Sequence, residues 1–120
     1  MEIIFHASHE NSYAEIISDR TIIFETQDTL DLMADCRYQG ADGMIIRREH
    51  LTEDFFDLRT GIAGDILQKI SNYRFRLAII GDFSNFTSKS LRDFIYESNK
   101  HRQVIFVSSL EDAIKEFIVL

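Results

Sequence analysis

Residues 75–80 are the part of the sequence that most constrains the fold. The run Leu77-Ala78-Ile79-Ile80 is apolar at every position, and Gly81-Asp82 ends it. A strand that is apolar on both faces is typical of a parallel sheet covered by helices. We therefore expect residues 75–80 to form a central strand of an α/β domain.

Strand-like and helix-like segments alternate around this central strand. The turn residues 10–12 separate the first two strands, which are expected to form an antiparallel hairpin. The later alternation requires parallel strands joined by right-handed crossovers. The strands are expected over residues 2–9, 13–18, 43–46, 75–80 and 103–107, and the helices over 27–39, 52–72, 88–98 and from 108 onward. The predicted fold class is α/β, with a mixed, mostly parallel five-stranded sheet, an N-terminal hairpin and about four helices.

Two segments have alternative interpretations. Residues 22–24 fit either a short strand or a covered approach to the first helix. Residues 52–72 fit one long helix or two helices broken between Leu58 and Gly61. Each of the glycines 61 and 64 costs a helix about 1 kcal/mol relative to alanine, and we favour the break.

The helices also have predicted faces and ends. Helical spacing places Leu30, Met33, Ala34 and Tyr38 on the inner face of the first helix. Ser108 and Glu111 have the spacing of a capping box at the start of the last helix.

Composition limits the classes of protein to which the chain can belong. A length of 120 residues predicts one domain over residues 1–120. No apolar run approaches the roughly 20 residues of a membrane helix, and no segment resembles a secretory signal, so a cytoplasmic protein without a membrane contact is expected. The net charge of −7 opposes a phosphate backbone, so nucleic acid is not an expected partner.

The predicted functional site lies at one edge of the sheet. Ligands of α/β sheets collect at the carboxyl ends of strands and at the helix N-termini that follow them. Four stretches are expected at this edge: Arg47-Arg48, Thr60-Gly61, Asp82 to Ser88, and Ser108-Ser109.

Thr60 has the most specific interpretation of these residues. A hydroxyl beside a glycine at a helix N-terminus leaves amide donors open to an anion, and the helix dipole would favour a phosphate attached there. Thr60 is therefore a candidate for phosphorylation or anion binding. The alternative is that Thr60 only caps its helix, the commonest role of threonine at such a position.

Polar residues and glycines concentrate on the helix that follows Thr60. One interpretation of these residues requires no ligand. The polar residues then form a solvated helix face with an ordinary ion pair between Asp65 and Lys69, and the glycines allow close packing on the sheet or on a second copy. The candidate ligand- or partner-binding residues are Arg59, Thr60, Gly61, Gly64, Asp65, Gln68, Lys69, Asn72 and Asp82.

Motifs for cofactor, metal or covalent chemistry are missing from the sequence. Gly61 and Gly64 lack the third glycine of a dinucleotide loop, and neither a Gly-Lys-Ser/Thr loop nor a Gly-x-Ser-x-Gly turn is present. The four histidines lie far apart, and Cys36 has no neighbouring Cys or His, so it is expected to be a buried small apolar residue. We expect no metal and no cofactor, and we favour a regulatory or binding role over an enzymatic one.

Several motifs resemble a bacterial family known as domain of unknown function 4180. They are the stretch from Phe55 to Lys69 (FFDLRTGIAGDILQK), the pairs Asn72-Tyr73 and Gly81-Asp82, and the segment from Asp93 to Asn99 (DFIYESN). The resemblance covers nearly the whole chain after residue 13. It implies no activity, substrate or cofactor.

The order of elements also resembles the STAS domain of anti-anti-sigma factors and of sulfate-transporter tails. In that domain a Ser or Thr begins the helix after the third strand, and its phosphorylation breaks a complex with a partner. Thr60 falls nearest that place. The chain departs from the Asp-Ser-Ser-Gly type of signature, with Asp57-Leu58-Arg59-Thr60-Gly61 in its position.

Three functional hypotheses follow. The first is a small cytoplasmic regulatory or binding module of STAS-like type that engages a protein partner or an anionic ligand through the start of the Thr60 helix. The second is a small enzyme or ligand sensor with a polar pocket around Arg59, Asp65, Lys69 and Asp82. The third is a structural homodimer in which the Gly61/Gly64 helix packs against its twin.

Overall fold

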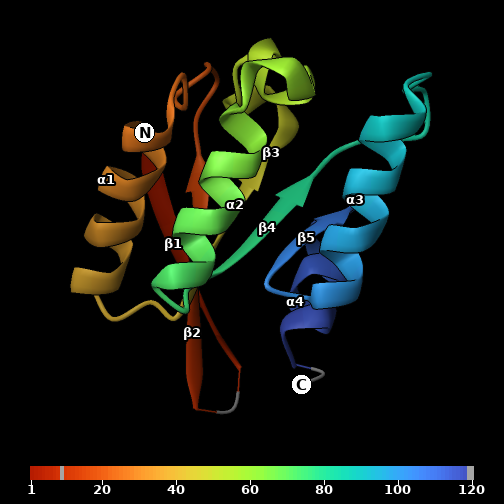
Figure 1. Ribbon diagram of the computed structural model, residues 1–120. Coiled ribbons are helices and arrows are strands. Elements are labelled where there is room, and N and C mark those ends of the chain that lie inside the picture. The colour runs from red at the N-terminus through yellow and green to blue at the C-terminus, as the bar shows by residue number, and fades with distance from the viewer. Residues whose placement is uncertain (9, 119–120) are drawn as a thin grey trace.

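The five strands of the sheet lie side by side in the order in which they occur in the chain, β1-β2-β3-β4-β5. The computed structural model describes residues 1–8 and 10–118 (Figure 1). β1 and β2 are antiparallel, and every later pair is parallel. The strands are β1 (Glu2–Ser8), β2 (Asn11–Ile17), β3 (Gly43–Arg47), β4 (Arg76–Ile80) and β5 (Val104–Val107), and the α-helices are α1 (Thr26–Tyr38), α2 (Ile62–Asn72), α3 (Lys89–His101) and α4 (Leu110–Ile118). The predicted α/β class, sheet and hairpin are confirmed.

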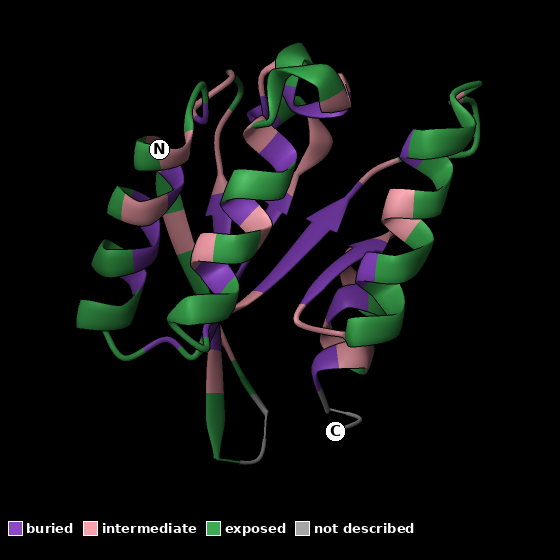
Figure 2. Cartoon of the chain, viewed as in Figure 1, coloured by how far each residue is buried: buried purple, intermediate pink, exposed green. Residues whose placement is uncertain are grey.

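Both faces of the sheet are covered by helices. Right-handed crossovers between successive parallel strands place α1, α2 and α3 in one layer, and α4 lies on the opposite face (Figure 1). Along β4, Leu77 and Ile79 belong to the core under α1, α2 and α3, whereas Ala78 and Ile80 belong to the core under α4. Figure 2 shows β4 buried along almost its whole length. The double-sided apolar run therefore reflects two cores that share one strand.

The segment before α2 is a series of turns rather than a continuous helix. Short 3₁₀ turns cover Glu53–Phe56 and Leu58–Thr60. Gly61 then adopts the left-handed conformation, with φ of 77°, and α2 begins at Ile62. A residue with a side chain is strained at this φ, so Gly61 is the point where the chain changes direction. The favoured break between Leu58 and Gly61 is confirmed.

The predicted inner face of α1 is partly wrong. Tyr38 is 91% exposed and Ala34 is exposed as well, whereas Met33 is buried as expected. The helix instead buries the stripe Thr29, Leu32, Met33 and Cys36. This stripe follows the same helical period but is rotated from the predicted one. The burial of Cys36 agrees with its expected role, whereas the burial of Thr29 was not predicted, because apolar spacing does not count a threonine.

The segment over residues 22–24 makes only a single contact of the strand type. Ile23 forms an isolated parallel bridge with Leu51, and the amides of Ile22 and Ile23 both donate to the carbonyl of His50 at 2.9 Å. Of the two interpretations left open by the sequence, the covered approach to the first helix is therefore the one that the structure has, with Ile23 buried. Within the described residues, no helix is both long enough and apolar enough to cross a membrane.

Candidate functional site

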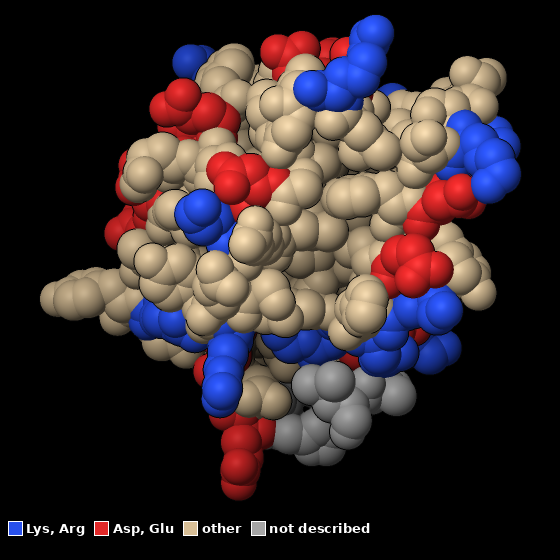
Figure 3. Space-filling model, viewed as in Figure 1, with Lys and Arg blue, Asp and Glu red and all other residues tan. Residues whose placement is uncertain are grey.

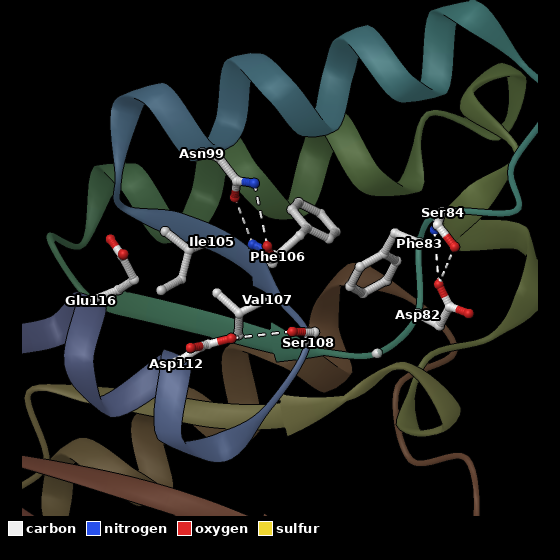
Figure 4. Close-up of a pocket in the computed structure, with 11 residues that line it drawn as sticks. Asp82, Phe83, Ser84, Asn99, Ile105, Phe106, Val107, Ser108, Asp112 and Glu116 are labelled. Atoms are coloured by element: carbon white, nitrogen blue, oxygen red, sulfur yellow. Dashed lines mark hydrogen bonds between the residues drawn. The ribbon is translucent and has the colours of Figure 1, made fainter.

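A pocket lies where the chain leaves the last two strands. After β4 the chain turns to α3 on one face of the sheet, and after β5 it turns to α4 on the other face. Divergent connections at the carboxyl ends of neighbouring parallel strands leave a crevice between them. The cavity here, which we call the β4–β5 pocket, has a volume of about 700 Å³. It is lined by Gly81, Asp82, Phe83, Ser84, Asn99, Ile105, Phe106, Val107, Ser108, Asp112 and Glu116 (Figure 4).

Asp82 forms a tight turn at the end of β4. Its Oδ1 accepts hydrogen bonds from the hydroxyl of Ser84 at 2.6 Å and from the amide of Ser84 at 3.0 Å. These two bonds, together with the charge of Arg48, hold the pKa of the Asp82 carboxyl below its ordinary value. Asp82 is therefore ionised at neutral pH, and within the described residues its Oδ2 makes no hydrogen bond.

Arg48 fixes the loop that carries Asp82. Its guanidinium lies over the rings of Phe86 and Phe56, at 4.5 and 5.2 Å from their centres, and its Nη1 donates to the carbonyl of Asp82. A Cβ at Gly81 would lie 2.8 Å from Cβ of Arg48. Only glycine allows the backbone to approach this arginine so closely.

Asn99 of α3 holds the other wall of the pocket in place. Its Oδ1 accepts from the amide of Phe106 at 2.7 Å, and its Nδ2 donates to the carbonyl of Phe106 at 3.2 Å. The side-chain amide thus occupies the position that a neighbouring strand would otherwise take beside β5. Figure 4 shows both bonds.

The segment from Ser108 to Glu116, which includes most of α4, supplies a hydroxyl and two carboxylates. Ser109 caps the helix, because its Oγ accepts from the amide of Asp112 at 3.0 Å. The predicted capping pair of Ser108 and Glu111 is therefore wrong by one residue. Ser108 instead donates from its Oγ to Oδ2 of Asp112 at 3.1 Å and lines the pocket. Glu116 lies one turn further along α4 and pairs with Arg102 at 3.0 Å.

The electrostatic character of the pocket is acidic. Asp82, Asp112 and Glu116 contribute carboxylates, and no lysine or arginine is among its lining residues. The lining also has apolar residues: Phe83 and Phe106, whose rings meet edge to face at 5.3 Å, and Ile105 and Val107 beside the carboxylates of α4 (Figure 4). Such a lining favours a ligand that has both a positive charge and an apolar body.

The residues predicted from the sequence are distributed over several places. Arg59 is exposed and binds Asp57 through two hydrogen bonds of 3.0 and 2.9 Å. Asp65 and Lys69 form an ion pair of 3.3 Å on α2. These residues do not line the β4–β5 pocket, so the four-residue pocket of the enzyme hypothesis is not assembled within the described residues. Of the candidate binding residues named from the sequence, Asp82 is the one that lines the β4–β5 pocket.

The Thr60 hydroxyl is occupied by its own turn. Oγ1 lies 2.8 Å from the carbonyl oxygens of both Asp54 and Asp57, to which it can donate, and it accepts from the amide of Ile62 at 3.3 Å. Thr60 therefore links the 3₁₀ turns to the first residue of α2. The N-cap position itself belongs to Gly61.

The remaining candidates lie on the outer side of α2. Asn72 and Gly64 are exposed, and a Cβ at Gly64 would meet nothing within 4 Å among the described residues, so packing on the sheet explains the neighbouring Ala63 and not this glycine. Gln68 lines a groove of about 430 Å³ between α2 and α3. Figure 3 shows charged side chains of both signs around the margin of this face and uncharged residues across its centre.

Cys36 and His50 are buried and take structural positions. Burial and the nearby Asp35 raise the pKa of the Cys36 thiol to about 11, which leaves it protonated and unreactive at neutral pH. His50 is buried between the amide of Arg47 and the carbonyl of Ser18, at 3.0 Å from each. His9 lies outside the described residues. Among the residues that are described, no group of three His, Cys, Asp or Glu could hold a metal ion.

Several residues of the pocket were missed at the sequence level. Asn99, Asp112 and Glu116 lie on helices, and their spacing fits an ordinary solvated face. The sequence signal for Asp112 and Glu116 is a pair of acids four residues apart on the helix that follows β5 and Ser108. The contact of Asn99 with the backbone of β5 has no equivalent signal, because it depends on where α3 crosses the sheet edge.

Fold and site together define a small α/β domain with an acidic pocket at the carboxyl ends of its last two strands. The family model described as Domain of unknown function (DUF4180) matches residues 8–117, and the chain belongs to this family. Comparison with curated proteins and with solved structures found no match. The family resemblance expected from the sequence is confirmed, and the STAS resemblance stays a prediction.

Proposed function

We propose that this protein is a cytoplasmic binding module that takes a small organic cation, such as a primary amine with an apolar body, into the β4–β5 pocket. The observation that carries this proposal is the lining of the pocket. Asp82, Asp112 and Glu116 surround an apolar wall that has no basic residue. A bound ammonium group would gain charge-assisted hydrogen bonds, and its apolar part would cover Phe83 and Phe106.

The same lining argues against the anionic ligand expected from the sequence. An anion in the pocket would face the carboxylates of Asp82 and Asp112, and like charges repel; Glu116 is paired with Arg102, and no basic residue lines the pocket. The anion hypothesis relied on the Thr60 helix, whose first amide is occupied by the threonine hydroxyl. The cation hypothesis keeps Asp82 as a ligand-binding residue and changes the expected charge of the ligand from negative to positive.

The lowered pKa of Asp82 and the hydrogen bond to Asp112 support binding over catalysis. An effective general base has a pKa near the working pH. The bonds from Ser84 shift the pKa of Asp82 in the opposite direction, so this carboxylate is a weak base. Asp112 already accepts a hydrogen bond from Ser108. The lowered pKa of Asp82 therefore suits this carboxylate to hold a fixed negative charge.

A titration with three matched probes tests this proposal. Phenethylamine, 2-phenylethanol and phenylacetate share an aromatic body and differ in the charge of the polar group. We expect phenethylamine to bind most tightly and phenylacetate least tightly, as measured by chemical-shift changes at residues 81–84 and 105–108. Tighter binding of phenylacetate would overturn the proposal.

Two variants separate the pocket from the general negative charge of the protein. Asp112→Asn should weaken phenethylamine binding by about fivefold, the effect of losing about 1 kcal/mol of charge interaction. Asp31→Asn removes the same charge from an exposed position on α1 and serves as the control. Equal losses in both variants would contradict a specific site.

A STAS-like regulatory role of Thr60 is the second candidate function. It is favoured by the exposure of Thr60 and by the hydrogen bonds through which its hydroxyl joins the turns to α2. A phosphate on Oγ1 would remove the hydroxyl proton and place negative charge beside the carbonyls of Asp54 and Asp57. The modification would then open this turn and change the surface offered to a protein partner.

Thr60→Glu and Thr60→Ser test this second candidate. Hydrogen exchange of the amides in residues 53–62 should become faster in Thr60→Glu, and should stay near the wild-type rate in Thr60→Ser, which keeps the hydroxyl. Unchanged exchange in Thr60→Glu would show that the turn does not respond to charge at this position, and the regulatory role would lose its physical basis.

A further inference from the structure

The two edges of the sheet differ in how their backbone groups are used. The outer edge of β5 is closed by α3, where Ser98 donates to the carbonyl of Val104 and Asn99 binds both polar groups of Phe106. The outer edge of β1 pairs with no other segment in residues 1–8 and 10–118. An open strand edge is a template for another strand.

The backbone groups that β1 leaves open can be identified from the pairing. The amide of Asp42 donates to the carbonyl of Ser12, so Ser12 and every second residue of β2 face β3. The alternate residues of β2, including Tyr13 and Glu15, face β1, and their partners are His6 and Ile4. The N–H and C=O groups that point outward from β1 therefore belong to Ile3, Phe5 and Ala7.

The side chains of β1 do not protect this edge. Natural edge strands are usually short or bulged, or carry lysine or proline. β1 is seven residues long, pairs with β2 at every position, and contains no lysine, arginine or proline. Ile4 and Phe5 are 43% and 41% exposed. The strand thus combines open hydrogen-bonding groups with exposed apolar side chains.

We infer that β1 is a homodimer interface, in which it pairs antiparallel with β1 of a second copy and the two sheets become one. The chemistry of the strand selects a register with Ile4 on the twofold axis. This register places Ile4 opposite Ile4, Ile3 opposite Phe5, and Glu2 opposite His6 of the second copy. Apolar residues then meet each other, and no like charges are opposed.

The interface is independent of the proposed function and of the Gly61/Gly64 helix. The β4–β5 pocket lies at the opposite margin of the sheet, so the dimer leaves both pockets open. A second copy fits better than a foreign strand, because the strand is complementary to itself in this register. Each copy carries a charge of −7, so added salt should strengthen the dimer by screening repulsion between copies.

Light scattering of the full chain over a range of micromolar concentrations tests the inference. We expect a dimer that dissociates on dilution and in the variant Ile4→Lys. Tyr38→Lys makes the same charge change at a residue of α1 that is 91% exposed, and it should leave the dimer intact. Circular dichroism establishes that both variants are folded. A wild-type monomer throughout, or a dimer that survives Ile4→Lys, would overturn the inference.

Crosslinking tests the register. In the proposed register, Ile4 and Ile4 of the second copy form a non-hydrogen-bonded pair. The Cα atoms of such a pair in an antiparallel ladder lie about 4.5 Å apart, a spacing compatible with a disulfide. Ile4→Cys should therefore form an intermolecular disulfide on mild oxidation, and Phe5→Cys should not. The native Cys36 is buried and does not interfere. Crosslinking through Phe5→Cys alone would show a different register.

Discussion

Thr29 is a residue whose side chain is poorly matched to its surroundings. It is 1% exposed within the core stripe of α1, and its Oγ1 makes no hydrogen bond to any described residue. A buried hydroxyl without a partner loses its hydration without compensation. Valine has nearly the same shape and would avoid this loss of hydration.

We predict that Thr29→Val stabilises the protein. The free energy of unfolding should rise by about 1 kcal/mol, because the unpaired hydroxyl disappears and both residues are β-branched with similar helix propensity. Urea denaturation measures the change. Thr87→Val, at an exposed position, is the matched control and should change stability by less than about 0.5 kcal/mol. A loss of stability in Thr29→Val would reveal a hydrogen bond that the hydroxyl makes in solution.

At the scale of elements, α3 stabilises β5 through side chains as well as through its apolar face. We predict that Asn99→Ala lowers the free energy of unfolding by about 1–2 kcal/mol, because the amide and carbonyl of Phe106 lose their partner. Hydrogen exchange at the Phe106 amide should also become faster. Glu97→Ala is the control, since its ion pair with Lys100 is long and exposed. Equal stability of the two variants would contradict the bracing role of Asn99.

The elements differ in how well the sequence predicted them. Double-sided apolarity predicted β4, and alternation of strands and helices predicted the whole sheet, because both signals arise from burial. The rotated face of α1 was not predicted, because a threonine such as Thr29 fits either a buried or an exposed position of a helix. The capping of α4 by Ser109 was not predicted, because either of the adjacent serines at 108 and 109 fits an N-cap. Asp82 was named from the sequence at the edge of the sheet where the β4–β5 pocket lies, whereas the other carboxylates of the pocket depend on the position of α4.

At the scale of the whole molecule, a buried carboxylate connects three strands. Glu15 of β2 accepts hydrogen bonds of 2.8 Å from His6 of β1 and from Arg47 of β3. Burial raises the pKa of Glu15, but the hydrogen bonds from His6 and Arg47 outweigh burial and hold the pKa below its ordinary value of 4.5. The group therefore stabilises the fold when it is ionised.

This arrangement predicts an acid-dependent part of the stability. Above pH 4.5 the contribution of Glu15 is fully present, and it is lost as the pH falls through the lower pKa of the folded state. Glu15→Gln should be less stable than wild type at neutral pH, and the difference should shrink as the solution becomes acidic. Denaturation curves at a series of pH values measure this difference. A constant difference at all pH values would show that the charge of Glu15 is not responsible.

The sequential strand order has a consequence for synthesis on the ribosome. No strand has to be inserted between two strands made earlier, so each parallel strand can join the sheet as soon as it leaves the exit tunnel. In contrast, α4 follows all five strands in the chain, so it can pack on the sheet only after they have been made. The ring of Phe117 stacks on that of Tyr13 with centres 4.3 Å apart, and the carbonyl of Phe117 accepts from Arg76 at 3.0 Å. A nascent chain whose α4 is still in the tunnel therefore lacks the contacts by which Phe117 joins Tyr13 of β2 to Arg76 of β4.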